Sequence, residues 1–198
     1  MGFASFQSYF GRIFDVVIFG AGYSAFGAAL RAREDGKSVC LVNRQADLLW
    51  ESGRAFMPHS GTADVPLWNR WTAILKARNS ATDTEIDGAL AEIIATDHLT
   101  DKNIAVLYYS VPVAAETEGD ILESVIVATK SGFQRLVARQ WIDATEKGEV
   151  LGLLNSSFEP KTPVQRHLFA YYQHLSWPNQ ETAWPGGCRR KWTEGRWK

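Results

Sequence analysis

The sequence has few of the residues that cross-link small proteins or bind metals. Its 198 residues include only two cysteines, Cys40 and Cys188, and four histidines. Two cysteines provide no disulfide framework, and no pair of histidines lies at a ligand spacing near a carboxylate. We therefore expect no metal site and no disulfide scaffold. Cys40 lies inside an apolar run and is expected to be a small buried residue.

Charge of one sign and long apolar runs are also scarce. The formal net charge is −1, and no apolar run reaches the ~18 residues that a transmembrane helix needs. The first residues lack the basic-then-apolar order of a signal peptide. These absences predict a cytoplasmic protein without a membrane span. The hydrophobic content of 45% is enough for a sizeable core.

Glycine is placed where it forms a distinctive turn near the start of the chain. The apolar run of residues 16–19 leads into Gly20 and Gly22, a small-residue helix follows, and a second apolar run covers residues 39–42. This order predicts a βαβ unit. Gly20 allows a sharp turn, Gly22 allows close approach to a pyrophosphate, and Ala25 replaces the third glycine of the pattern.

The βαβ unit predicts a dinucleotide site. Backbone N–H groups at the start of a helix attract a phosphate group, because the helix dipole adds to their charge. The residues expected to bind there are Gly20, Ala21, Gly22, Tyr23, Ser24 and Ala25. The alternative is an α/β unit whose glycines form an ordinary turn without a ligand.

The end of the second predicted strand departs from the usual pattern. A ribose diol is normally bound there by Asp or Glu, about 20 residues beyond the glycines. This chain has Asn43, whose amide can accept and donate hydrogen bonds but carries no charge. The neighbouring Arg44 leaves open a site for the 2′-phosphate of NADP, although an arginine at a strand end is more often simply solvated.

The rest of the chain alternates helical and extended patterns. Helices are expected over residues 66–78 and 83–97, the second with Asp83 as its N-cap. Between Asn43 and the first of these helices the sequence has no clear period, so a loop is expected. Strands are expected over residues 105–109, 111–117, 121–129, 133–138 and 141–144, with a short helix near Glu149. Three of these strands, from residue 111 to 138, form a β-meander.

This order of elements, together with the Asp143-Ala144-Thr145 turn, resembles the N-terminal part of FAD-dependent oxidoreductases with the glutathione-reductase-like fold. The resemblance covers residues 14–154. It implies a Rossmann-like, three-layer α/β domain that binds FAD or NAD(P), with a parallel central sheet and an antiparallel β-meander. It also implies that FAD is the cofactor and that the glycine turn faces its pyrophosphate.

The resemblance assigns further residues to the cofactor. Asn43 would face the adenosine ribose, and the backbone of Val113 would face the adenine edge. Ala144 and Thr145 would pass close to the cofactor where the last core strand ends. Glu146 stands where the family has glycine, which adds a side chain and a negative charge near the diphosphate.

The ends of the chain lie outside this resemblance. Residues 1–13 are expected to be an N-terminal extension. Residues 155–198 are expected to be the start of a truncated substrate domain, and from Pro160 onward they carry seven Lys or Arg against two Glu. Nucleic-acid binding by this basic, Trp-rich segment is the weaker alternative, because no binding motif accompanies it.

The sequence therefore predicts an FAD-dependent oxidoreductase that is inactive alone, with its substrate and catalytic residues unassigned. One alternative is an NAD(P)-binding Rossmann protein. Another is a non-catalytic remnant, or a subunit whose fold is completed by a partner chain or a second copy.

Overall fold

The computed structural model describes residues 13–55, 65–83, 85–155 and 157–159, and the backbone of two short paired strands, β7 (Trp192–Thr193) and β8 (Arg196–Trp197). Expectations for Cys188, for residues 1–12 and for the tryptophans of the tail fall outside the residues whose side chains are described.

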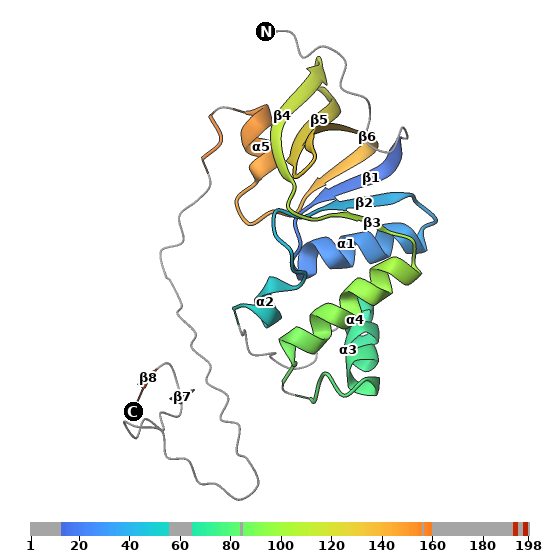
Figure 1. Ribbon diagram of the computed structural model, residues 1–198, viewed down its shortest axis with the longest axis vertical. Helices are drawn as coiled ribbons and strands as arrows, with labels where there is room; N and C mark the ends of the chain where they lie inside the picture. Colours follow the sequence, from blue (N-terminus) through green and yellow to red (C-terminus); the bar gives the residue numbers. More distant parts are fainter. Residues whose placement is uncertain are drawn as a thin grey trace, which may run out of the picture.

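The domain is built on a six-stranded sheet with the order β3-β2-β1-β6-β5-β4 (Figure 1). β1 (Phe14–Phe19) lies between β2 (Val39–Val42) and β6 (Gly132–Asp143) and runs parallel to both. β3 (Ala105–Leu107) pairs parallel with the outer side of β2. The expected parallel sheet, with residues 16–19 in its interior, is confirmed.

β6 pairs with two different strands along its length. Its residues 132–137 pair antiparallel with β5 (Ile121–Thr129), and residues 138–143 pair parallel with β1. β4 (Val111–Glu118) completes the meander at the sheet edge. The prediction that residues 133–138 and 141–144 form two separate strands is thus wrong. They form one strand because the residues between them contain no glycine or proline that would end it.

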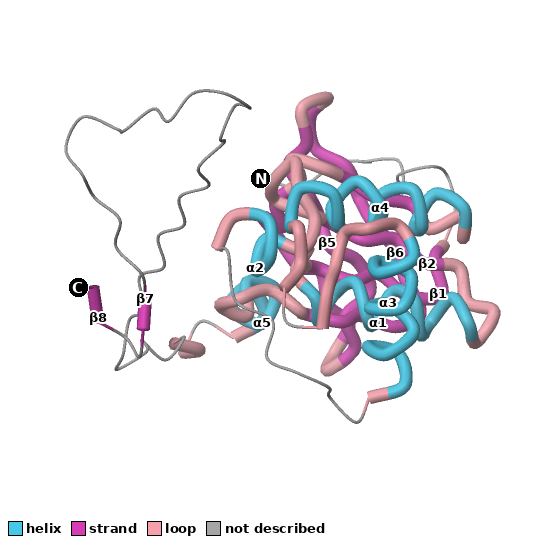
Figure 2. Tube along the Cα trace, turned by 90° about the horizontal axis from the view of Figure 1, so that it is seen from below, coloured by secondary structure: helices cyan, strands magenta, loops and turns pink. Residues whose placement is uncertain are grey.

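Helices cover one face of the parallel strands. α1 (Tyr23–Glu34) packs on β1 and β2, and α3 (Pro66–Ala77) packs on α1. Figure 2 looks onto this helical layer, which also contains α4 (Gly88–Asp101), with the strands behind it. The buried cluster on this face includes Ile18, Phe26, Leu41, Trp71 and Leu75.

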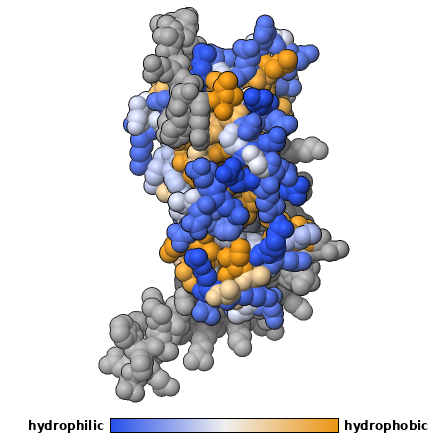
Figure 3. All heavy atoms as spheres, turned by 90° about the vertical axis from the view of Figure 1, so that its right-hand side faces the viewer, coloured by the Kyte–Doolittle hydropathy of each residue, from blue (hydrophilic) through white to orange (hydrophobic). Residues whose placement is uncertain are grey.

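The other face of the same strands is covered by the meander and by α5 (Glu149–Leu154). Its buried cluster includes Phe19, Cys40, Val127, Leu136 and Val150. Cys40 is fully buried, as expected. Helices, parallel strands and meander make three layers. On the face shown in Figure 3, hydrophilic residues predominate and hydrophobic ones form small separate groups.

α4 begins later than the sequence suggests. Its N-cap is Asp87, whose Oδ1 accepts a hydrogen bond from the N–H of Leu90 at 3.0 Å. Asp83, the expected cap, instead forms an ion pair with Lys76. Both aspartates suit an N-cap, but a bridge between Ala81 and Ile86 turns the chain first and leaves the later one at the helix start.

Two smaller boundaries also differ. The segment expected to be a loop contains a single helical turn, α2 (Trp50–Gly53). β3 ends at Leu107, short of the expected residue 109, because Tyr109 adopts a φ of 52°, which no strand accommodates. α3 and α5 lie where they were expected.

Candidate cofactor site

The site begins at Gly20, where three strands end side by side. The Gly20 N–H donates to the carbonyl of Val42 at 2.9 Å, and the Ala144 N–H donates to the carbonyl of Phe19 at 2.8 Å. Gly20 has a φ of +125°, and a Cβ there would lie 2.5 Å from the Ala144 carbonyl oxygen. Only glycine fits this position, which joins the carboxyl ends of β1, β2 and β6.

Gly22 caps α1 and leaves room in front of the helix. The Tyr23 N–H, first in the helix, donates to Oε1 of Glu51 at 2.9 Å. A Cβ on Gly22 would lie 2.3 Å from the same Oε1 and 2.9 Å from Nε1 of Trp50. The room that Gly22 provides is therefore occupied by two side chains of α2. Ala25 is fully buried against the sheet side of the helix.

A cleft of about 170 Å³ opens at the carboxyl ends of these strands. Seven of the predicted cofactor-binding residues line it, namely Gly20, Ala21, Gly22, Asn43, Arg44, Ala144 and Thr145. Glu146 lines it as well. Residues that the sequence pattern did not single out for it also line it, among them Gln45, Trp50, Arg54, Ser110, Lys147 and Glu149. Their positions follow from loop packing, for which the sequence offers no periodic signal.

Three other predicted residues lie beside the cleft. The Tyr23 hydroxyl hydrogen-bonds with Oγ of Ser52 at 2.6 Å, so this side chain ties α1 to α2. Ser24 is exposed on the first turn of α1. Val113 is 42% exposed on β4, and it is its neighbour Pro112 that lines the cleft.

Asn43 lies at the end of β2, but its side chain is committed to its own loop. It is 2% exposed; its Nδ2 donates to the Asp47 carbonyl and its Oδ1 accepts from the Gln45 N–H, both at 2.8 Å. The predicted contact with a ribose therefore competes with two existing hydrogen bonds.

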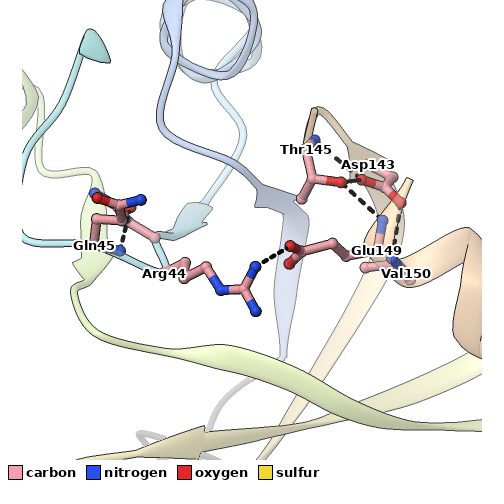
Figure 4. Close-up of polar contacts among 7 residues, drawn as sticks. Arg44, Gln45, Asp143, Thr145, Glu149 and Val150 are labelled. Atoms are coloured by element: carbon pink, nitrogen blue, oxygen red, sulfur yellow. Dashed lines mark hydrogen bonds and ion pairs between the residues drawn. The ribbon is translucent and has the colours of Figure 1, made fainter. Parts of the chain in front are cut away.

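An ion pair spans the cleft. Arg44, following β2, donates from Nη1 to Oε1 of Glu149 at 2.6 Å, and Glu149 is the first residue of α5 (Figure 4). Arg44 is exposed and Glu149 half-buried, so solvent screens this pair and its contribution to stability is small. Its geometry matters more, because it places an arginine and a carboxylate over the strand ends.

The Asp143-Ala144-Thr145 turn is held by its aspartate. The Asp143 carboxylate accepts hydrogen bonds from the N–H of Val150 at 2.9 Å and from the Thr145 hydroxyl at 2.6 Å (Figure 4). It also accepts one from the N–H of Leu151 at 3.1 Å. It thereby caps α5 and fixes the backbone of Ala144 against Gly20.

Glu51 lies at the start of α1, behind the glycine turn that lines the cleft. Burial raises the pKa of its carboxyl, and nearby Glu146 raises this pKa further. Its Oε2 atom is buried and has no hydrogen-bond partner among the described residues. In the described part of the chain, no cluster of His, Cys, Asp or Glu could hold a metal ion.

Comparison with known families decides what this site belongs to. The profile of the family described as FAD dependent oxidoreductase matches residues 15–160. The chain belongs to this family. FAD is the cofactor of this family, and the match includes the glycine turn and the Asp-Ala-Thr turn. No curated protein matches the chain.

Solved structures share the fold of this FAD-dependent oxidoreductase domain at low identity. AlpK aligns with a TM-score of 0.53 at 20% identity over 71% of this chain, and Thermovibrio ammonificans THI4 with 0.54 at 14% over 73%. The flavin-dependent brominase Bmp2 aligns with 0.54 at 12% over 68%. These alignments cover 33%, 62% and 38% of the respective proteins. The chain thus spans less than two thirds of the length of each.

Around the glycine turn the backbone suits the diphosphate of FAD, whereas the carboxylates of Glu51 and Glu146 oppose its negative charge. The glycines permit close approach, and the helix start supplies N–H groups. The Glu51 carboxylate, however, already accepts from the first of those groups.

Among the described residues no helix is long and apolar enough to cross a membrane.

Proposed function

We propose that residues 14–154 bind the diphosphate and adenosine half of FAD in this cleft and form the FAD-binding part of an oxidoreductase. The observation that carries the proposal is the cleft at the carboxyl ends of β1, β2 and β6, which opens around the Gly20–Gly22 turn. Ligands of open α/β sheets bind at this edge. When bound, FAD supplies the redox chemistry, and the protein supplies position and electrostatics.

Backbone N–H groups, cationic side chains and one small residue of the chain contribute to binding. N–H groups in the first turn of α1 face the diphosphate, since they have no acceptor within the helix. Lys147 and Arg44, the latter paired with Glu149, are cationic side chains at the lining of the cleft. Ala144 lets its strand end close to Gly20 and keeps that wall of the cleft free of a large side chain.

We further propose that this domain is inactive until a second polypeptide segment covers the flavin and the substrate. Two observations support this. The chain spans only part of the length of the solved structures with the same fold. In addition, α5, next to the cleft, exposes Leu151 at 44% and Leu154 at 43%, an apolar surface suited to contact with protein. The completing segment is a further domain, a partner chain or a second copy.

The first prediction tests FAD binding by a substitution in the turn. Gly22→Ala is expected to weaken FAD binding at least about tenfold, because a methyl group occupies the position where the diphosphate must approach. Gly27→Ala is the matched control on the same helix, since its nearest neighbour would be Leu67 Cδ2 at 3.5 Å. Affinity is measured by titration, using the visible absorption of bound flavin.

The same titration separates the proposal from its rival. A wild-type protein that binds NAD or NADP and leaves FAD free would establish the NAD(P)-binding alternative. Equal FAD affinity in Gly22→Ala and Gly27→Ala would remove the turn from the site.

A further inference from the structure

Glu51 brings a carboxylate to the start of α1 from 28 residues further along the chain. Its Oε1 accepts a hydrogen bond from the Tyr23 N–H at 2.9 Å. A Cβ added to Gly22 would lie only 2.3 Å from the same oxygen. The start of a helix carries a partial positive charge, so an anion is stabilised there. In this structure that anion belongs to the protein itself.

The carboxylate is held by incomplete contacts. Its second oxygen, Oε2, is buried without a hydrogen-bond partner among the described residues, and the negative charge of Glu146, in the turn after β6, also raises the pKa of this carboxyl. A buried, half-satisfied carboxylate near a second carboxylate is costly. Glu51 is therefore poised to leave when a better anion arrives or when it takes up a proton.

We propose that Glu51 occupies the diphosphate position at the start of α1, and that a dinucleotide binds only after this carboxylate has moved away or become neutral. Glu51 is then the residue that sets the affinity of the turn for diphosphates. This inference rests on the proposed function, because it takes the Gly20–Gly22 turn as the FAD site.

A pH dependence follows. Burial raises the pKa of Glu51, so the carboxyl becomes neutral at a higher pH than an exposed glutamate. FAD binding should tighten as the pH falls through this pKa, while the FAD diphosphate keeps its charge. The groups that face Glu51 are Tyr23 on α1 and Glu146 after β6. Other charged groups near α2 in the described part of the chain include the ion pair of Asp47 with Arg54 and the carboxyl of Glu92.

The test compares FAD affinity in three variants with the wild type at several pH values. Glu51→Ala is expected to bind FAD at least about tenfold more tightly than the wild type at neutral pH, because it removes both the occupant and its charge. Glu51→Gln should fall between them and lose the pH dependence. Glu146→Gln, the matched control, removes a charge from the same cleft without vacating the helix start. It should give a smaller gain and retain the pH dependence.

A second measurement keeps the inference testable apart from FAD. Inorganic pyrophosphate is added to the wild type and to Glu51→Ala, and the amide signals of Tyr23, Ser24 and Ala25 are followed by NMR. Larger shifts at lower pyrophosphate concentration in Glu51→Ala support the inference. Equal responses in both proteins, or weaker FAD binding in Glu51→Ala, overturn it. Absence of FAD binding in every variant, with the pyrophosphate difference present, rejects FAD as the ligand and retains the role of Glu51.

Discussion

At the scale of single residues, Gly20 combines a left-handed backbone with no room for a side chain. Gly20→Ala is expected to lower the free energy of unfolding by about 3 kcal/mol or more, since the substitution combines a forbidden φ with a contact of 2.5 Å to the Ala144 backbone. Gly36→Ala is the control. It has a φ of +76° but no atom within 4 Å of the added Cβ, and should cost about 1 kcal/mol. Urea unfolding measures both, and equal losses would contradict the role of the Ala144 contact.

Particular residues show which parts of the candidate site could be predicted from the sequence. The glycine turn was predictable, because a strand, two glycines and a helix follow one another within a few residues. The contact of Glu51 with Tyr23 was not, since it depends on how a loop of irregular sequence folds back onto α1. Asn43 was found at the expected strand end, but the direction of its amide is decided by Asp47 and Gln45 within the loop.

At the scale of elements, α5 depends on Asp143. This helix has only six residues, too few to be stable by themselves, and the Asp143 carboxylate accepts from the N–H groups of Val150 and Leu151 in its first turn. Asp143→Ala is expected to lower the free energy of unfolding by about 1–2 kcal/mol, and Asp143→Asn by less, because one acceptor oxygen remains.

Amide hydrogen exchange locates the effect of Asp143→Ala. Faster exchange is expected at Val150 and Leu151, with little change in β2. Asp120→Ala, in the exposed turn between β4 and β5, is the control and should leave both unchanged. Unaltered exchange in α5 of Asp143→Ala would show that packing on β4 suffices to hold the helix.

Elements differ in how well their limits can be predicted. β2 and β5 matched their apolar runs, because glycine or polar residues stop them at both ends. The start of α4 was predicted at Asp83 and lies instead at Asp87, which has the same capping chemistry. The sequence predicted two strands where the structure has the single strand β6. Its pairing partner changes from β5 to β1 along its length, and the sequence of the strand does not show where a partner changes.

At the scale of the whole molecule, β6 joins the two parts of the domain. The helices cover one face of the parallel strands, while the meander and α5 cover the other, so β1 and β2 contribute different residues to each of the two buried clusters. β6 carries the hydrogen bonds from that parallel sheet into the meander. The meander is therefore not an independent attachment. We expect the domain to unfold as a single cooperative unit.

Leu136→Ala tests this unity. Leu136 is 1% exposed in β6 and lies opposite Val125 of β5, in the half of the strand that pairs with the meander. Its truncation is expected to cost about 2–5 kcal/mol. If the sheet unfolds as one unit, amide protection should fall by the same free energy in β1 as in β5, although Leu136 faces only the latter across the ladder. Ile121→Ala, at a position 71% exposed, should change neither by more than about 0.5 kcal/mol. Loss of protection in β5 with β1 unchanged would mean that the meander opens independently of the strands that form the cleft.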